Sequence, residues 1–267
     1  MRLSLFLMMA VVVGGCAGVQ QAPEQAVRDL APSSKLRAAI NVGNPVLAAR
    51  GTSATNGDPS GVSVDLAREL ARRLGVPVEL IVFDAAGKVV EAGKSGAWDI
   101  GFVALDPLRA QDIAQSPPYV VIEGAYLVRE NSSVKSNDEV DRPGNRIVVG
   151  RASAYDLYLT RNIKRAQLVR VQGSPLVVAT FMKEGYEVAA GVKQQLEADA
   201  KKTPGVRLLP GRFMVINQAM ASQRDRPAGA RYVREFIEEM KASGFVAQAL
   251  ARHGVQGAAV APAGDPQ

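Results

Sequence analysis

The sequence of 267 residues contains one cysteine and one histidine, and only 5% of its residues are aromatic. A single cysteine, Cys16, cannot form an intrachain disulfide. A single histidine, His253, leaves no histidine pair for a transition-metal site, and no motif has metal-ligand spacing. We therefore expect neither a metal ion nor a cofactor. His253 lies in the last helical pattern of the chain, where we predict a surface or capping residue.

Motifs of nucleophilic catalysis are also missing. The chain has no Gly-x-Ser-x-Gly elbow, no phosphate-binding P-loop and no cysteine after Cys16. Ser132 and Lys135 fit a Ser-x-x-Lys pattern, but the companion motifs are absent, so the match is interpreted as chance. The net charge is +6, yet the basic residues are interspersed, with little aromatic interleaving. This pattern argues against nucleic-acid binding, and the chain is predicted not to be an enzyme.

A strongly apolar run stands at the start of the sequence and not within the predicted fold. Arg2 precedes residues 3–13, which are too few to span a bilayer and have the anatomy of an export signal. The run ends at Val13-Gly14-Gly15-Cys16, which resembles the bacterial lipoprotein box. We predict a lipoprotein signal peptide over 1–15, a lipid on Cys16 and a tether over 16–34. A plain secretory signal with an incidental cysteine is the alternative.

The remainder of the chain alternates between strand and helix patterns. Strands are predicted at 36–42, 76–83, 100–105, 123–128, 146–150, 168–171, 188–190, 206–209 and 211–216, and helices at 61–75, 86–92, 154–163, 174–182, 194–201, 229–243 and 245–253. This order favours right-handed βαβ units and mostly parallel sheets. Because the plan that begins at residue 36 restarts at 146, we predict two α/β lobes. The small-residue tail 256–267 is expected to be disordered.

The chemically most informative stretch is the apolar strand 100–105 with the residues that follow it. Asp106 suits a helix N-cap and Pro107 the first helical position. Arg109 would then lie in the first turn, beside unpaired N–H groups and the positive end of the helix dipole. A cation is unfavourable there unless an anion joins it, and a carboxylate matches the guanidinium fork. The pattern predicts a carboxylate ligand at Arg109; the alternative is a surface ion pair with Asp106 or Asp112.

Four motifs in sequence order carry a resemblance to a known family. They are Gly61-Val-Ser-Val-Asp-Leu-Ala, the stretch 93–99 with the strand after it, Arg109-Ala-Gln-Asp-Ile with Ser116-Pro-Pro-Tyr, and the closing helix 232–244 followed by Phe245. In this arrangement, residues 35–253 resemble the bacterial solute-binding proteins of the polar amino acid type, family 3.

The resemblance implies a two-lobed, type II periplasmic binding protein-like fold, in which each lobe has a mostly parallel sheet flanked by helices. Lobe 1 would comprise 35–127 and 218–255, and lobe 2 would comprise 128–217. Two segments would cross between the lobes, near 125–129 and 213–219. A ligand would be enclosed by hinge motion at the carboxyl ends of the strands. The resemblance also implies a monomer outside the cytoplasm, held by its lipid at the membrane, that delivers its solute to an ABC permease.

The same resemblance implies a set of binding residues. Arg109 carries over as the residue that grips the ligand carboxylate, and Ser153 offers a hydroxyl and a backbone N–H from lobe 2. The full predicted ligand site is Arg109, Ala104, Asn44, Phe83, Ser153 and Ala154.

Three departures from the family pattern concern the ligand. Residues 103–107 replace the usual Thr or Ser turn, and residues 44–46 replace an aromatic. Val192 stands near the expected acidic partner of a ligand ammonium, and a buried ammonium without a counter-charge costs several kcal/mol. We expect a small carboxylate-bearing solute, with an amino acid or derivative as the leading candidate. The alternatives are an exported cyclohexadienyl or prephenate-type dehydratase, using Glu123 or Glu187, and a non-transport sensory binding protein.

The lipid anchor yields a direct prediction. Because Cys16 is the proposed lipidation site, Cys16→Ser should release the protein from the membrane fraction or block its processing. Fractionation followed by immunoblotting measures both effects. Membrane association that is unchanged in Cys16→Ser would show that the lipid is not on this cysteine.

Overall fold

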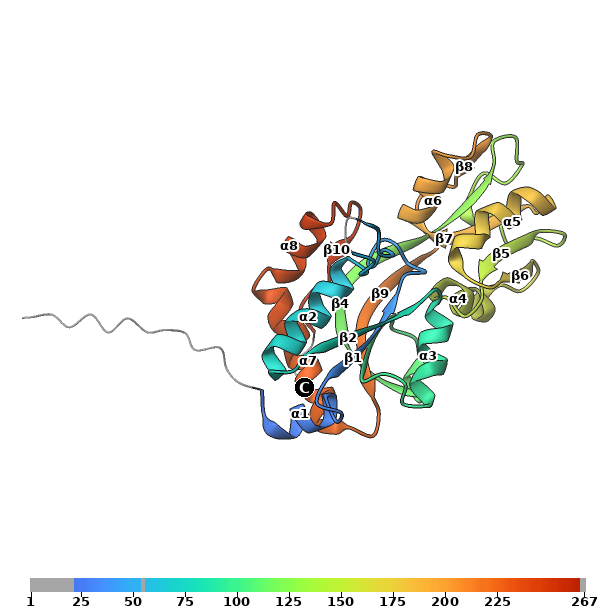
Figure 1. Ribbon diagram of the computed structural model, residues 1–267. Helices are drawn as coiled ribbons and strands as arrows, with labels where there is room; N and C mark the ends of the chain where they lie inside the picture. Colours follow the sequence, from blue (N-terminus) through green and yellow to red (C-terminus); the bar gives the residue numbers. More distant parts are fainter. Residues whose placement is uncertain (1–21, 54–55, 265–267) are drawn as a thin grey trace, which may run out of the picture.

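The computed structural model describes residues 22–53 and 56–264, and within them one continuous ten-stranded sheet runs through the molecule (Figure 1). The strands are β1 (Leu36–Asn41), β2 (Val78–Phe83), β3 (Ile100–Ala104), β4 (Ile113–Arg129), β5 (Arg146–Gly150), β6 (Gln167–Val171), β7 (Val188–Val192), β8 (Val206–Leu208), β9 (Met214–Gln223) and β10 (Ala259–Val260). The helices are α1 (Glu24–Leu30), α2 (Val62–Leu74), α3 (Ala86–Lys94), α4 (Ala154–Asn162), α5 (Val177–Glu184), α6 (Lys193–Ala200), α7 (Pro227–Ala242) and α8 (Phe245–Arg252), with short 3-10 turns η2 (Arg109–Gln111), η3 (Asn137–Glu139) and η4 (Ser174–Leu176). The predicted α/β class is confirmed.

The sheet has two parallel halves that are joined by two long antiparallel strands. Its order is β2-β1-β3-β9-β4-β7-β5-β6, and β8 and β10 pair with β4. Strands β1, β2 and β3 are parallel to one another, as are β5, β6 and β7. Strand β4 pairs with β9 over residues 113–124 and continues along β7 and β8. In Figure 1, β4 and β9 connect the group around α1, α2, α3, α7 and α8 with the group around α4, α5 and α6.

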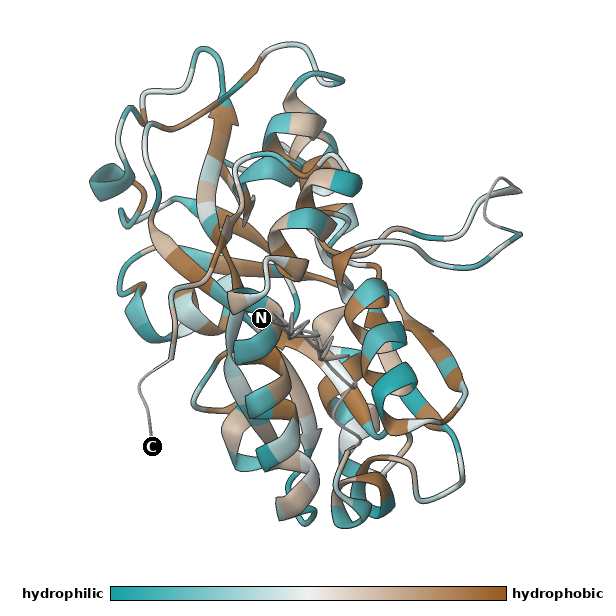
Figure 2. Ribbon diagram, turned by 90° about the vertical axis from the view of Figure 1, so that its left-hand side faces the viewer, coloured by the Kyte–Doolittle hydropathy of each residue, from teal (hydrophilic) through white to brown (hydrophobic). Residues whose placement is uncertain are grey.

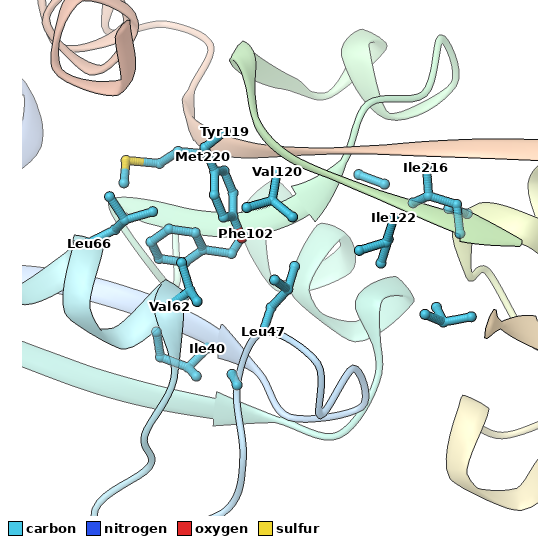
Figure 3. Packing of buried hydrophobic residues seen from close by; sticks show 14 of the residues in the cluster. Ile40, Leu47, Val62, Leu66, Phe102, Tyr119, Val120, Ile122, Ile216 and Met220 are labelled. Carbon is cyan, nitrogen blue, oxygen red and sulfur yellow. The ribbon is translucent and has the colours of Figure 1, made fainter. Parts of the chain in front are cut away.

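Hydrophobic residues concentrate on the strands, whereas the helices carry both hydrophilic and hydrophobic residues (Figure 2). Near the centre of the core, Leu66 of α2 points toward Phe102 and Tyr119 (Figure 3). The Phe102 and Tyr119 rings meet edge to face with centroids 6.0 Å apart. The fully buried Tyr119 hydroxyl is 3.2 Å from the Ser63 hydroxyl. Family motifs from distant parts of the sequence therefore pack together.

Gly61 shows why the first of these motifs begins with glycine. Its φ is 129°, and a Cβ at this position would lie 2.4 Å from the Leu47 carbonyl oxygen. A side chain is excluded on both grounds. The close approach lets α2 begin directly against the 47–48 segment.

The predicted tether is wrong from residue 22 onward. Residues 24–30 form α1, which packs on α7, and Ala26 and Leu30 are buried. The Asp29 carboxylate accepts a hydrogen bond of 2.9 Å from the Gly229 N–H. The apolar stripe Ala22, Ala26 and Leu30 has helical spacing, but it is too narrow to stand out without the α7 surface that it covers.

The predicted disorder of the tail 256–267 is wrong for the residues that the structure describes, which end at 264. Strand β10 pairs antiparallel with β4 through Ala259 and Val260. The Ala261 N–H donates to the Tyr119 carbonyl oxygen at 3.1 Å, and Ala261 is buried. This segment covers the edge of β4, whose backbone groups would otherwise be unpaired.

Cys16 and the predicted signal peptide lie outside the described residues. Across 22–53 and 56–264, no helix is long and apolar enough to cross a membrane.

The contact between α1 and α7 predicts that α1 stabilises the fold. Leu30→Ala should lower the free energy of unfolding by about 2–4 kcal/mol, because a fully buried leucine is truncated. Gln25→Ala, an exposed change on the same helix, should alter it by no more than about 0.5 kcal/mol. Urea unfolding measures both variants. Equal stabilities would show that α1 is peripheral to the fold.

Candidate functional site

A small cavity, with about 40 Å³ of space for water-sized molecules, lies where the two halves of the sheet face each other. The residues that line it are Asn41, Gly43, Asn44, Ala86, Ala104, Arg109, Ser153, Ala154, Tyr155, Ser174, Val192, Ile216 and Gln218. The carboxyl ends of β1, β3 and β7 reach it, together with the amino ends of α3 and α4. In open α/β sheets this is the edge at which ligands bind. The lining is mostly small or neutral, with one side chain that carries a charge at neutral pH.

That charged side chain is Arg109, which is 3% exposed. Its Nη1 donates to the Ala104 carbonyl oxygen at 2.9 Å, and its Nη2 donates to the Ala152 carbonyl oxygen at 2.8 Å. Burial lowers the pKa of Arg109 to about 10, although the nearby Asp106 charge opposes the shift. The guanidinium is therefore a buried cation at neutral pH.

The surface ion pair considered as an alternative for Arg109 is not formed. Asp106 pairs with Arg161 at 2.8 Å, and Asp112 lies 3.5 Å from Lys94. No carboxylate of the described residues is within ion-pair distance of Arg109. Its hydrogen bonds go to backbone carbonyl oxygens, and Asp106, which is paired with Arg161, acts on it only at longer range. Such a buried cation is costly, and an anionic ligand would relieve it.

The predicted helix at residue 107 is a single 3-10 turn, η2. Asp106 is not its N-cap: η2 begins at Arg109 after Leu108, with no side-chain cap, and the Asp106 Oδ1 accepts from the Leu108 N–H at 2.9 Å in the preceding turn. The chain then enters β4 at Ile113, which pairs with Gln223 of β9. Pairing with a strand more than a hundred residues away ends the helix after one turn.

The opposite wall of the cavity is the beginning of α4. Ser153 is the N-cap, and its hydroxyl oxygen accepts from the Asp156 N–H at 3.1 Å. The first-turn N–H groups of Ala154 and Tyr155 have no intrahelical acceptor, so they are available to an anion. Both residues line the cavity. The Ser153 O–H, these N–H groups and the Arg109 guanidinium form a donor set suited to a carboxylate.

Ala152 connects the two walls. It has a φ of 55°, and its N–H donates to the Asp156 carboxylate at 2.8 Å. Its carbonyl oxygen is thereby directed to Arg109. A Cβ on Gly87 of α3 would lie 2.6 Å from the Ala152 Cβ. The amino ends of α3 and α4 are therefore in close contact, as Figure 1 shows.

The structure brings Arg109, Ala104, Asn44, Ser153 and Ala154 together around the cavity. Phe83, which was also predicted to bind ligand, does not line it. Its side chain packs against the cluster that contains Val89, Trp98 and Val103. Phe83 ends the edge strand β2, which is one strand farther from the cavity than β1.

Several lining residues were not predicted. Asn41 ends β1 and Ser174 begins the turn after β6, so both were detectable as polar residues at carboxyl ends of strands. Gln218, which is 7% exposed, lies opposite Ala104 in the β3–β9 register. No local sequence signal marks it, because its place depends on the pairing of distant strands.

Neither glutamate considered for a dehydratase lines the cavity. Glu123 pairs with Lys193 at 3.0 Å and with Arg212 at 2.6 Å. Glu187 pairs with Arg146 at 2.7 Å. His253, predicted as a surface or capping residue, is the C-cap of α8, and its Nε2 is 2.9 Å from the Asp65 carboxylate.

Comparison with protein families identifies the chain. Residues 46–256 match the model of the bacterial extracellular solute-binding proteins, family 3, and the chain belongs to this family. No curated protein sequence matches the chain.

Solved structures agree on the fold. An amino acid ABC transporter substrate-binding protein from Streptococcus pneumoniae bound to L-arginine has a TM-score of 0.73 at 16% identity, over 85% of this chain and 97% of that chain. The cysteine-binding protein from Campylobacter jejuni also has a TM-score of 0.73, at 17% identity over 85% and 92%. An ancestral amino acid-binding protein, a precursor of cyclohexadienyl dehydratase, has a TM-score of 0.71 at 17% identity over 85% and 97%. The predicted type II periplasmic binding protein fold is confirmed.

Because Arg109 is a buried cation, we expect it to lower the stability of the folded chain. Arg109→Met should keep the free energy of unfolding within about 1 kcal/mol of the wild type or raise it, because it removes a buried cation at similar volume. Arg129→Met is the matched control, since Arg129 is half-buried, donates to the Tyr186 carbonyl at 2.7 Å and stacks on Phe181. This control should lose about 1–3 kcal/mol.

The pH dependence provides a second measurement on the same variant. Burial lowers the pKa of folded Arg109 from its ordinary value to about 10, so the folded chain loses this proton before the unfolded chain does. The stability of the wild type relative to Arg109→Met should therefore rise as the pH increases through about 10. Urea unfolding at several pH values measures the difference. A loss in Arg109→Met as large as that in the control would indicate a structural arginine.

Proposed function

We propose that this chain is the solute-binding component of an ABC importer and captures a small carboxylate-bearing solute, an amino acid or derivative, between two lobes. The observation that carries the proposal is the buried guanidinium of Arg109 without a carboxylate partner, which faces the cavity. Family membership supports the transport role, since the family consists of extracellular solute-binding proteins.

The proposed carboxylate site combines groups from both halves of the sheet. Arg109 supplies a planar pair of donors from η2, and α4 supplies the Ser153 hydroxyl with the free N–H groups of its first turn. A carboxylate placed between them neutralises the guanidinium and lies at the positive end of a helix dipole. The ligand would therefore connect the two halves.

The proposed motion is a hinge closure of lobe 2 (128–217) on lobe 1 (35–127 with 218–255), about the crossing strands β4 and β9. Contacts between these segments support the view that the described form is closed. Arg161 of α4 pairs with Asp106, and the Gln194 amide donates to the Gly257 carbonyl oxygen at 2.7 Å. Both contacts would separate on opening, as would the bond from Arg109 to Ala152.

The remaining parts of the proposal rest on the sequence and on the family. The export signal and Cys16 support a monomer outside the cytoplasm that is held at a membrane by its lipid. An ABC permease complex would be its partner. The dehydratase alternative gains no support, because Glu123 and Glu187 are paired with basic residues away from the cavity.

Arg109 is the residue through which the proposal is tested. Arg109→Ala should weaken the binding of a carboxylate ligand by about 2–5 kcal/mol, the usual effect of removing one partner of a buried charge pair. Arg109→Lys should recover only part of the loss, since a point charge cannot form two parallel hydrogen bonds. A thermal-shift screen of amino acids, opines and dicarboxylates identifies a ligand, and calorimetry measures the affinities.

Arg151, an exposed arginine in the neighbouring loop, is the control for a general change in charge. Arg151→Ala should leave the affinity nearly unchanged. A loss of less than tenfold in Arg109→Ala would contradict the proposed site.

Hinge closure is tested by small-angle scattering of the protein with and without that ligand. Saturation should reduce the radius of gyration, because the lobes approach each other. An identical scattering curve at saturation would contradict a ligand-driven closure.

A further inference from the structure

The charge balance of the cavity is unusual for a site that would hold a zwitterion. The residues that line it include one arginine and no aspartate or glutamate. The acids in or beside the surrounding segments are already paired, as is Glu123 with Lys193 at 3.0 Å. Asp106 pairs with Arg161 at 2.8 Å, Asp156 with Arg170 at 3.0 Å and Asp84 with Lys88 at 2.8 Å.

The carbonyl oxygens beside Arg109 are also occupied. The Ala104 carbonyl oxygen accepts from Arg109 at 2.9 Å and from the Gln115 amide at 3.1 Å, which uses both of its lone pairs. The Ala152 carbonyl oxygen accepts from Arg109. A ligand ammonium next to Arg109 would therefore have to share these two carbonyl oxygens with the guanidinium, a cation of like charge.

The carboxyl end of β7 is apolar where it meets the cavity. Val192, the last residue of β7, lines the cavity and is 8% exposed. Ala86 and Ile216 add further apolar surface. An ammonium placed against these side chains would lose its hydration without gaining a counter-charge.

Neutral polar groups are available instead. The Asn44 Oδ1 atom is buried without a hydrogen-bond partner, and Asn44 lines the cavity. Gln218 and Ser174 present a neutral amide and a neutral hydroxyl to the same space. A hydroxyl on the ligand would donate to the Asn44 oxygen, and an oxo group would accept from the Gln218 amide or the Ser174 hydroxyl, in either case at no cost in charge.

From these observations we infer that the ligand is a small monocarboxylate that carries a neutral polar group, a hydroxyl or an oxo group, in place of an ammonium. This inference deepens the proposed function and rests on its carboxylate site at Arg109. One carboxylate brings the charge of the site to zero. A zwitterionic amino acid leaves a net positive charge in a buried space, and a dicarboxylate leaves a net negative one.

Val192 is the residue that would determine this selectivity. An acid at the end of β7 would supply the missing counter-charge for an ammonium and would repel an additional negative charge. Val192→Asp should therefore favour amino acids over the hydroxy and oxo acids, which carry a neutral group in place of the ammonium. Val192→Asn has nearly the same size as Val192→Asp and no charge, so it separates the effect of charge from that of polarity and shape.

The test uses the purified full chain and sets of acids that share a carbon skeleton. The probes are L-alanine, L-lactate and pyruvate, and the 2-amino, 2-hydroxy and 2-oxo acids with four, five and six carbons. Calorimetry should show that a hydroxy or oxo acid binds at least tenfold more tightly than its amino counterpart. Arg109→Ala should weaken both, whereas Val192→Asp should reduce the ratio at least tenfold and Val192→Asn should preserve it.

The possible outcomes separate the inference from the function on which it rests. In one outcome, the wild type binds an amino acid as tightly as, or more tightly than, its hydroxy and oxo analogues, and Arg109→Ala abolishes that binding. This result would overturn the inference and support the proposed carboxylate site. Failure of every acid to bind, or binding that is unaffected by Arg109→Ala, would overturn both. The wild-type comparison decides the inference even if Val192→Asp does not fold.

Discussion

The proposed function of this molecule depends on one buried guanidinium that has no carboxylate partner. Arg109 is held by the Ala104 carbonyl from its own segment and by the Ala152 carbonyl from the opposite wall. Two neutral acceptors do not compensate a buried cation as an anion would, and this is the reason for proposing an anionic ligand. One acceptor comes from each side of the cavity, so the Arg109 guanidinium contacts both walls.

The sheet makes this contact possible. Two parallel halves present the carboxyl ends of their strands toward a common cavity, and β4 and β9 pass between them as an antiparallel pair. Each wall of the cavity therefore belongs to one half of the sheet and has its own helices. Asp106 and Arg161 show the consequence, since an aspartate in the turn before η2 also forms an ion pair with α4. Small changes at the crossing strands would separate residues that are far apart in the sequence.

The chemistry of the lining distinguishes the carboxylate end of the cavity from the rest. Donors gather around one position, where Arg109, Ser153 and the start of α4 converge. Elsewhere the surface is apolar, as at Val192, or neutral, as at Asn44. Selectivity in such a site is a matter of net charge, because a low-dielectric cavity with one fixed cation accepts a single negative charge most readily.

The sequence by itself determined most of the strands and helices between residues 36 and 252 and the family, and it singled out Arg109 as the candidate binding residue. Strand 100–105, Asp106-Pro107 and Ser153 are local signals, produced by neighbours along the chain, and such signals can be interpreted without a structure. Tertiary structure decided what local patterns do not contain. Helix α1 depends on the surface of α7, β10 on the open edge of β4, and the single turn of η2 on the pairing of Ile113 with Gln223. Gln218 enters the cavity only through its register with Ala104. Each of these features arises from contact between segments that are distant in the sequence, and the energy of those contacts exceeds the weak preferences of the residues involved.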